Sequence, residues 1–202
     1  VPGLPDLAGV YRVCHDTALT TGGRRMKLRD PDLVGHLYAG PYVVAASEWG
    51  EGVVDDEGVA GYVLSVPDTE AFAAWAEAEW WPALRERYPL ALAHERAESW
   101  PDDSALIRSL HSPGRPPSEI ATDYPAHFHI DLLPRLQGQG WGRRLIERMV
   151  SRLRAADVAG VHMGVVADNA SAIGFYEHLG FGVLHADAHT CWMGMDLRPQ
   201  SA

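Results

Sequence analysis

The clearest change of hydrophobic pattern in the chain lies between residues 128 and 153. An apolar stretch at residues 128–133 predicts a strand that stops at Pro134. Further along, apolar residues recur at the helical period of about 3.6 residues. They are Leu145, Ile146, Met149, Val150 and Leu153. The pattern therefore predicts a strand and an amphipathic helix joined by a short turn.

The turn between them reads Gln137-Gly138-Gln139-Gly140-Trp141-Gly142. The first turn of a helix has backbone N–H groups without an intrahelical partner, and the helix dipole adds partial positive charge there. Glycines allow a phosphate to approach these N–H groups closely, so the turn predicts a pyrophosphate site. It is not a P-loop, which requires Gly-Lys-Ser/Thr, and its glycine spacing differs from the Rossmann fingerprint.

A second block of the same kind follows at residues 169–181. Asp168 or Asn169 predicts a helix N-cap, and Gly180 closes the helix after about Leu179. Tyr176 stands seven positions after Asn169, and Leu179-Gly180-Phe181 follows it. An apolar stretch at residues 161–166 predicts a strand between the two helices.

These two blocks together resemble the acetyltransferases of the GNAT superfamily (GCN5-related N-acetyltransferases). The shared features are Gln-x-x-Gly-x-Gly after a strand, and the Asn169–Tyr176 spacing followed by Leu-Gly-Phe. The resemblance implies an α/β fold of the α+β kind, with a mostly antiparallel twisted sheet. Helices flank this sheet, which is splayed at its fourth and fifth strands. It also implies one domain over residues 1–202, and acetyl-CoA (coenzyme A) as the cofactor of an N-acetyltransferase.

The first half of the chain predicts shorter elements. Residues 9–13 alternate as a strand does, and residues 30–38 predict a capped helix that ends at Gly40-Pro41. Residues 52–55 and 59–65 predict a tight hairpin across Asp56-Glu57-Gly58. A competing pairing joins residues 42–47 to residues 59–65.

Asp68 predicts the cap of a long helix in which Pro82 either starts the second half or causes a kink. The helix contains three tryptophans, Trp75, Trp80 and Trp81. They indicate core packing or, alternatively, an acceptor-binding surface. Residues 90–124 contain several prolines and predict an irregular insertion that covers the active site, with a short helix near residues 104–111. Residues 181–184 and 190–197 predict a final antiparallel pair.

The hairpin, the tryptophan-rich helix and Ile130-Asp131-Leu132-Leu133-Pro134 are also similar to a narrower group. This group is the acetyltransferase-like domain at the C-terminus of animal O-GlcNAcase and its free-standing bacterial relatives. The animal domain is regarded as a pseudo-acetyltransferase without the cofactor loop. The present chain has the loop, which favours cofactor binding, but an inactive acyl-CoA-binding or interaction module remains the alternative function.

The resemblance implies a role for each site residue. The pantetheine arm and the acetyl carbonyl pair with backbone groups of the splayed strand, by position Ile130, Asp131 and Leu132. The pyrophosphate binds N–H groups from the glycine turn to the helix start: Gln137, Gly138, Gln139, Gly140, Trp141, Gly142 and Arg143. Asn169 binds the pantetheine arm, caps its helix or does both. Tyr176 is the general acid toward the thiolate.

The general base is not settled by the resemblance. Some relatives have a glutamate five residues before the asparagine, where this chain has Gly164. His127, His129 and Asp131 alternate along the predicted strand and so share one face. His129 or Asp131 can accept the proton of the amine, and His162 on the neighbouring strand is another candidate. A metal site is not expected, because no third ligand lies at a diagnostic spacing.

Composition narrows the class of partner. The chain has 202 residues, a net charge of −10 and two cysteines, Cys14 and Cys191. The charge disfavours nucleic acid and is compatible with a cationic amine acceptor, either a small molecule or a protein. No apolar run is long enough to span a membrane, and the first residues do not resemble a signal segment. We therefore expect no membrane partner and, by default, a cytoplasmic location. GNAT proteins often dimerise through their late strands, so the resemblance is also compatible with a homodimer.

Overall fold

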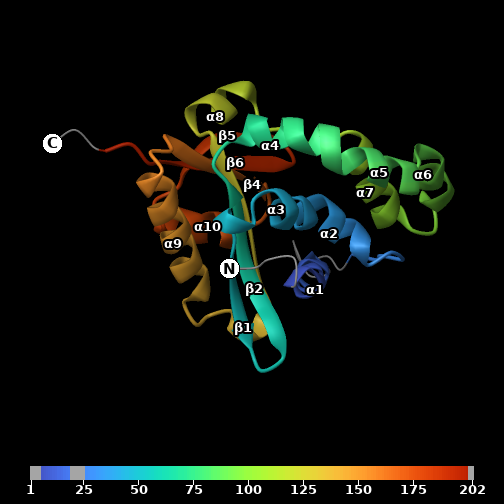
Figure 1. The fold of residues 1–202 in the computed structure, drawn as a ribbon, viewed down its shortest axis with the longest axis horizontal. Coiled ribbons are helices and arrows are strands. Elements are labelled where there is room, and N and C mark those ends of the chain that lie inside the picture. The colour runs from blue at the N-terminus through green and yellow to red at the C-terminus, as the bar shows by residue number, and fades with distance from the viewer. Residues whose placement is uncertain (1–5, 19–25, 200–202) are drawn as a thin grey trace.

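The computed structural model describes residues 6–18 and 26–199, and these ranges form a mixed sheet with helices on both faces (Figure 1). The strand order is β1-β2-β3-β4-β6-β5. Every neighbouring pair is antiparallel except β3 and β4. The strands are β1 (Glu51–Asp55), β2 (Gly58–Val66), β3 (Ala126–Leu132), β4 (Gly160–Val166), β5 (Gly182–Ala186) and β6 (Thr190–Asp196).

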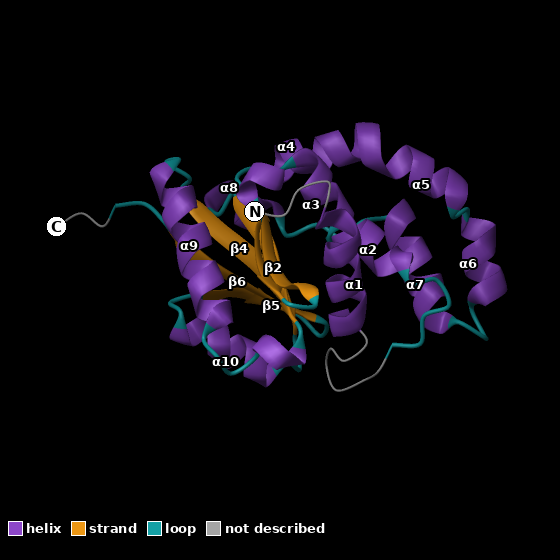
Figure 2. Ribbon diagram, turned by 60° about the horizontal axis from the view of Figure 1, so that its bottom comes forward, coloured by secondary structure: helices purple, strands orange, loops and turns teal. Residues whose placement is uncertain are grey.

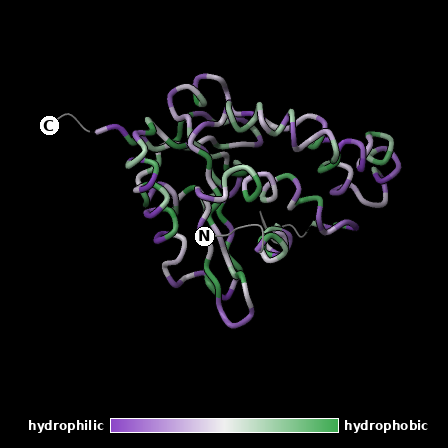
Figure 3. Tube along the Cα trace, viewed as in Figure 1, coloured by the Kyte–Doolittle hydropathy of each residue, from purple (hydrophilic) through white to green (hydrophobic). Residues whose placement is uncertain are grey.

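The helices divide into two groups on opposite sides of the sheet (Figure 2). On one side, α1 (Leu7–Ala18) packs on β2 and β3, and α3 (Gly40–Ala45) packs on β2. Helix α2 (Asp32–Tyr38) packs on both of these helices. On the other side lie α9 (Trp141–Ala155) and α10 (Ala170–His178). Strand β2 is therefore covered on both faces, and all of its residues after Gly58 are buried. Hydrophobic residues follow this central strand, whereas the tip of the β1–β2 hairpin is polar (Figure 3).

The predicted hairpin is confirmed. Asp55 lies opposite Gly58, whose φ of +103° is a conformation that glycine adopts readily. The competing pairing is wrong, because residues 40–45 form helix α3 and residues 47–49 a short 3₁₀ turn. The helix predicted at residues 30–38 is also confirmed, as α2.

The strand predicted at residues 9–13 is wrong, because these residues belong to helix α1. Val10, Val13 and Cys14 are buried, and this spacing places them on one helical face. Gly9 lets the helix approach β2 closely: a Cβ atom there would lie 2.7 Å from Val59 Cγ2. The alternating residues 9–13 thus belong to an amphipathic helix.

The helix predicted after Asp68 is confirmed, with the Asp68 carboxylate accepting from Ala71 N–H at 2.9 Å. It comprises α4 (Thr69–Trp75), a π-helical segment (Ala76–Trp80) and α5 (Trp81–Arg87). Pro82 lies in the first turn of α5, where an N–H group would have no partner within that helix, so its absence costs no helical hydrogen bond. Trp81 is buried in the core, whereas Trp75 and Trp80 are half-buried.

The prediction that residues 90–124 are irregular is wrong. The segment forms α6 (Leu90–Arg96), α7 (Pro101–His111) and α8 (Ser118–Asp123). Pro101 begins α7 and Pro117 precedes α8, so these prolines mark helix starts. Helix α7 packs on α2 and α5, and α6 lies at the opposite end of the molecule from α9 and α10 (Figures 1 and 2).

The second half of the chain matches its prediction closely. Both predicted helices are present as α9 and α10, and Gly180 ends the latter with a φ of +91°. The final antiparallel pair is β5 and β6. None of the helices within the described ranges combines the length and hydropathy that a bilayer crossing needs.

Candidate active site

Strands β3 and β4 pair only where they begin. Their parallel ladder joins Ala126 to Val161 and His127 to His162. Beyond these pairs, β3 continues along β2 and β4 continues along β6. The strands therefore diverge and leave a gap within the sheet, which confirms the predicted splay. The splayed strands are the third and fourth here, because the expected first strand is helix α1.

The backbone of β3 offers polar groups to this gap at alternate residues. Leu133 N–H donates to Ala60 C=O at 2.9 Å, and bonding alternates along an antiparallel ladder. The backbone groups of Asp131 therefore point toward β2, whereas those of Ile130 and Leu132 point toward β4. The expectation that Asp131 offers backbone groups to a ligand in the gap is corrected by this register. Only its side chain remains a candidate.

The glycine turn lies at the end of this gap. Gly138 and Gly140 have φ of +70° and +79°, and a Cβ atom at either position would meet no atom within 4 Å. Open space beside a left-handed backbone is what close approach of a ligand requires. Gly140 is also the N-cap residue of α9, and the first helical bond runs from Arg144 N–H to Gly140 C=O at 3.2 Å. The N–H groups of residues 141–143 thus lack an intrahelical acceptor.

The two glutamines brace this loop. Gln137 Nε2 donates to Leu132 C=O at 2.9 Å, and Gln139 Nε2 donates to Arg135 C=O at 2.6 Å. The Arg135 guanidinium in turn pairs with Asp55 at the hairpin, with Nε 2.7 Å from Oδ2. The loop is therefore tied back to β3 and to the hairpin while its glycines stay exposed.

The residues at the start of α9, Trp141 to Arg143, face different parts of the molecule. Trp141 turns toward β1, with the Arg144 guanidinium 5.0 Å from its ring centroid. Gly142 allows α10 to lie close, because a Cβ atom there would be 3.1 Å from Phe175 Cζ. Arg143 is exposed and only loosely paired with Glu147, at 3.4 Å. Its guanidinium is available to an anionic ligand, whereas Trp141 can offer only its backbone.

Helix α10 brings Asn169 and Tyr176 to the same region. The Asn169 side chain accepts from Ala172 N–H at 3.1 Å, which confirms its capping role. Tyr176 is half-buried, with its ring centroid 6.2 Å from that of Phe128 on β3. Burial raises the pKa of Tyr176, and the Asp131 carboxylate raises it further. The phenol is therefore protonated at neutral pH and can donate a proton.

The opposite face of β3 carries the two histidines that the sequence placed together. His127 Nε2 lies 2.7 Å from the Tyr42 hydroxyl, and His129 Nε2 lies 3.1 Å from the same oxygen. His127 Nδ1 lies 2.8 Å from Thr69 Oγ1. Burial lowers the pKa of His129 to about 4, and burial together with the two neighbouring histidines lowers that of His127 well below its usual value. Both rings are neutral at physiological pH.

Asp131 has its own partners on this face. Tyr62 Oη donates to Asp131 Oδ2 at 2.5 Å, and the buried Cys14 thiol lies nearby. Burial raises the pKa of Asp131, while the hydrogen bonds from Tyr62 and Thr17 partly oppose the shift. His162 is held separately: its Nδ1 lies 2.6 Å from Tyr124 C=O and therefore donates to it. This side chain is 1% exposed, so it is a poor candidate for a base.

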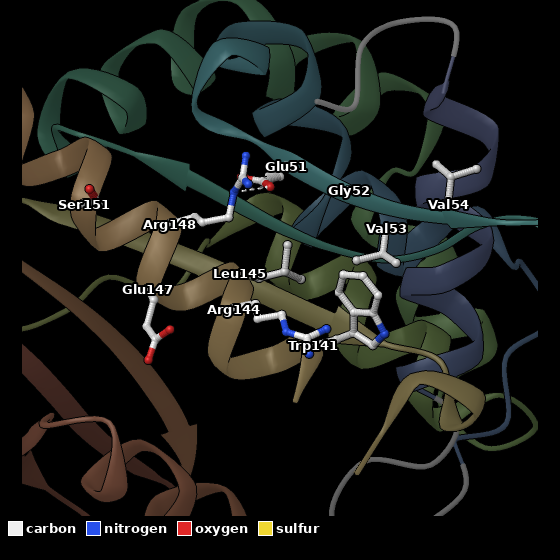
Figure 4. Close-up of a pocket in the computed structure, with 10 residues that line it drawn as sticks. All are labelled: Glu51, Gly52, Val53, Val54, Trp141, Arg144, Leu145, Glu147, Arg148 and Ser151. Carbon is white, nitrogen blue, oxygen red and sulfur yellow. Dashed lines mark ion pairs between the residues drawn. The ribbon is translucent and has the colours of Figure 1, made fainter. Parts of the chain in front are cut away.

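A hollow of about 560 Å³ lies on the other side of α9 from α10, between α9 and β1 (Figure 4). The Trp141 ring faces it, and an ion pair between Arg148 Nε and Glu51 Oε1, at 2.6 Å, crosses it. Strand β1 is separated from the β3–β4 gap by β2. The hollow therefore lies outside the β3–β4 gap, and the two regions share only the start of α9.

The structure also adds residues that the sequence did not indicate, namely Tyr42, Thr69 and Tyr62. They come from α3, α4 and β2, and each bonds to a polar side chain of β3. Nothing in their local sequence marks them. The only signal was indirect, since three polar residues on one face of an interior strand require partners.

Comparison with known proteins identifies the class. A sequence model of the acetyltransferase (GNAT) family matches residues 36–181. The chain therefore belongs to the GNAT family of acetyltransferases, as the two sequence blocks and the splayed sheet indicate.

Individual relatives agree with this assignment. The protein O-GlcNAcase of Rattus norvegicus is 21% identical over 176 residues, which are 87% of this chain. The chain spans about a fifth of that protein's length, 19%. The [ribosomal protein bS18]-alanine N-acetyltransferase of Escherichia coli strain K12 is 39% identical over 64 residues, which are 32% of this chain and 43% of that protein.

Solved structures share the whole fold. The crystal structure of SsHAT matches with a TM-score of 0.85 and 33% identity, covering 98% of each chain. The PaiA N-acetyltransferase from Thermoplasma acidophilum, solved in complex with coenzyme A, matches with a TM-score of 0.59 and 12% identity. The alignment covers 96% of this chain and 94% of that one. At this low identity, the match concerns the fold alone.

Proposed function

We propose that this protein is an acetyl-CoA-dependent N-acetyltransferase in which an amine attacks the thioester directly within a ternary complex. The observation that carries the proposal is the gap between β3 and β4. A glycine loop lies at its end, His129 approaches from one face of β3, and Tyr176 approaches from the other. Direct attack needs a positioned amine, a base and an acid, and this arrangement offers candidates for the base and the acid on either side of the gap.

The residues of the glycine loop fit a pyrophosphate. Gly138 and Gly140 leave open space beside the N–H groups at the start of α9, and the exposed Arg143 adds a positive charge. Ile130 offers its N–H and C=O inside the gap, where a pantetheine amide or the thioester carbonyl can pair with them. When bound, acetyl-CoA supplies the acetyl thioester. This chain supplies the hydrogen bonds that orient it.

We assign the role of base to His129 rather than to Asp131. A base must be unprotonated and within reach of the amine. His129 is neutral because burial lowers its pKa to about 4. The Asp131 carboxylate is already engaged by the Tyr62 hydroxyl at 2.5 Å. We therefore assign proton removal to His129 and assign Asp131 to the electrostatic attraction of the ammonium form of the acceptor.

Tyr176 is the acid in this proposal. Its ring packs against Phe128 and Phe181, with centroids 6.2 and 5.8 Å away, which fixes its position on the far face of the gap. Its hydroxyl makes no hydrogen bond to any residue in the described ranges and stays protonated at neutral pH. It can therefore give its proton to a leaving thiolate.

The acceptor binds, in this proposal, beside α2 to α4. Tyr38 is 40% exposed and its ring centroid lies 5.6 Å from that of His129. A row of rings continues from Tyr42 through Phe72 to the half-buried Trp75, with centroid separations of 4.5 and 6.0 Å. These aromatic side chains suit the apolar part of an amine or a cation before it loses its proton.

Isothermal calorimetry with acetyl-CoA, followed by a transfer assay over a panel of amines and peptides, tests the proposal. We expect micromolar binding in the wild type and thiol release with at least one class of amine. Loss of binding in Gly140→Trp but not in Gly114→Ala would place the ligand at the loop, because Gly114 is far from it in sequence and has open space around it. Binding without transfer across the whole panel would instead favour the alternative, a non-catalytic acyl-CoA-binding module.

A further inference from the structure

Four side chains form one continuous row of hydrogen bonds that ends at His129. Thr69 Oγ1 lies 2.7 Å from Pro125 C=O and 2.8 Å from His127 Nδ1. His127 Nε2 lies 2.7 Å from the Tyr42 hydroxyl, which lies 3.1 Å from His129 Nε2. The segments that supply them, α3, α4 and β3, are far apart in the sequence.

The donor and acceptor of every bond in this row follow from the carbonyl oxygen of Pro125, at the end of the row opposite His129. A carbonyl oxygen can only accept, so the single proton of the Thr69 hydroxyl lies toward Pro125 C=O. Thr69 Oγ1 must therefore accept from His127, which carries its proton on Nδ1. Because His127 is neutral, its Nε2 is an acceptor, and the Tyr42 hydroxyl donates to it.

The protonation state of His129 follows from its bond to Tyr42. The Tyr42 hydroxyl has given its only proton to His127, so toward His129 it can only accept. His129 therefore carries its proton on Nε2 and has a free lone pair on Nδ1. Among the described residues, the fully buried side-chain nitrogens without a partner belong to His36 and Arg96 only, and no group bonds to His129 Nδ1, so that nitrogen is unbonded and retains some exposure.

We propose that Thr69, His127 and Tyr42 are positioning residues that lock His129 in the Nε2–H tautomer and thereby direct its Nδ1 lone pair toward the acceptor amine. This inference rests on the proposed function, because it names the residues that make His129 a base. The opposite tautomer would present an N–H to the amine and could not take its proton.

The row cannot carry the proton away. It ends at Pro125 C=O, which also accepts from Thr69 N–H at 2.8 Å and has no proton to pass on. A proton taken at His129 Nδ1 therefore leaves from Nδ1 again, to solvent. The row holds the orientation of the imidazole, as a carboxylate or carbonyl does for the histidine of other acid–base sites.

The direct test is nuclear magnetic resonance of the protein with ¹⁵N-labelled histidine at pH 7.5, since ring-nitrogen shifts distinguish the two tautomers. The signals are assigned with His127→Gln and His129→Gln variants. We expect His127 to be protonated on Nδ1 and His129 on Nε2. A His129 ring protonated on Nδ1 would overturn the proposal, whether or not the protein transfers acetyl groups.

A matched pair of variants tests the effect on the reaction. Thr69→Val keeps the size of the side chain and the backbone bond to Pro125 but removes the acceptor of His127, so the whole row can reverse. We expect a shift of His129 toward the Nδ1–H form and a loss in kcat of about 10-fold or more, with acetyl-CoA affinity unchanged. Thr69→Ser retains the hydroxyl and should restore both the tautomer and kcat.

Tyr42→Phe gives an independent check, because it breaks the row between the two histidines. It should lower kcat without raising KM for acetyl-CoA. If Thr69→Val and Tyr42→Phe both fold and retain wild-type kcat, the lock is refuted. Failure of the proposed function has a different signature, namely a wild type that does not bind acetyl-CoA or transfers its acetyl group to no amine.

Discussion

The two faces of strand β3 differ in chemistry and in the way they are held. On the face toward α9 and α10, Ala126 and Phe128 are buried, and Leu132 lies near the start of α9. On the face toward α1, α3 and α4, His127 and Asp131 are polar residues held by hydrogen bonds. Under the proposed function, this interior strand separates the side that binds the cofactor from the side that binds the acceptor. We call them the cofactor side and the acceptor side.

The difference shows how each half of the site is specified. The cofactor side uses backbone N–H groups, left-handed glycines and a helix start, all within one continuous segment. The acceptor side uses side chains from α1, α3, α4 and β2, each of which satisfies a polar group of β3. We therefore expect changes on the first side to act on affinity and changes on the second side to act on turnover.

The largest effect is expected at Tyr176, which lies on the cofactor face but to which we assign the general acid of the chemical step. Tyr176→Phe should lower kcat by about 100-fold or more, because it removes a general acid, with little change in the Kd of acetyl-CoA. Tyr88→Phe is the matched control, since the Tyr88 hydroxyl bonds to Asp30, at 3.0 Å, and not to a residue of the site. Steady-state kinetics measure kcat, and calorimetry measures the Kd of acetyl-CoA. A wild-type kcat in Tyr176→Phe would show that Tyr176 is not the general acid.

The polar face contains two candidate bases, and a pair of isosteric variants separates them. His129→Gln should lower kcat by about 100-fold, whereas Asp131→Asn should lower it by about 10-fold or less, because only the former removes the proposed base. Both should keep the affinity for acetyl-CoA. The reverse ranking in the same kinetic assay would transfer the role of base to Asp131.

On the cofactor face, Gly140→Ala should weaken acetyl-CoA binding by about 10-fold, or 1.4 kcal/mol, because its Cβ atom enters the open space beside the loop N–H groups. The substitution also strains a residue with φ of +79°. Gly180→Ala imposes a similar strain, at φ of +91°, away from the loop. Equal losses of affinity in both variants would show that backbone strain, and not the loop, controls binding.

The smallest effect is on stability and concerns the buried histidines. Burial lowers the pKa of His127, His129 and His162, so the unfolded chain binds more protons between about pH 4 and 6.5. The free energy of unfolding therefore rises with pH across this window, and this contribution is lost as the pH falls. Asp131, whose pKa is raised, acts in the opposite sense.

This prediction is measured as a difference in slope. Denaturant unfolding at pH 7 and pH 5 should show that the wild type loses about 1–2 kcal/mol more on acidification than His127→Gln does. His94→Gln is the matched control because His94 is exposed. Identical slopes for the wild type and His127→Gln would mean that His127 is not held neutral by the polar face.

The sequence by itself determined the cofactor side. The strand, glycine loop and helix of residues 126–155, the Asn169 cap and the β1–β2 hairpin were all predicted. Each depends on contacts within a few residues along the chain: a left-handed glycine, a capping side chain or a helical period. Such interactions are visible in a single segment, which is why the family could be inferred from two short blocks.

Only the tertiary structure decided the acceptor side. Residues 9–13 became a helix because Val10, Val13 and Cys14 bury one helical face against the sheet, an effect stronger than local strand preference. Tyr42 and Thr69 meet His127 across 85 and 58 positions of sequence. Alternation along β3 showed that its polar residues share a face. Their hydrogen-bond partners, and hence the tautomer of His129, depend on packing between segments that no local pattern records.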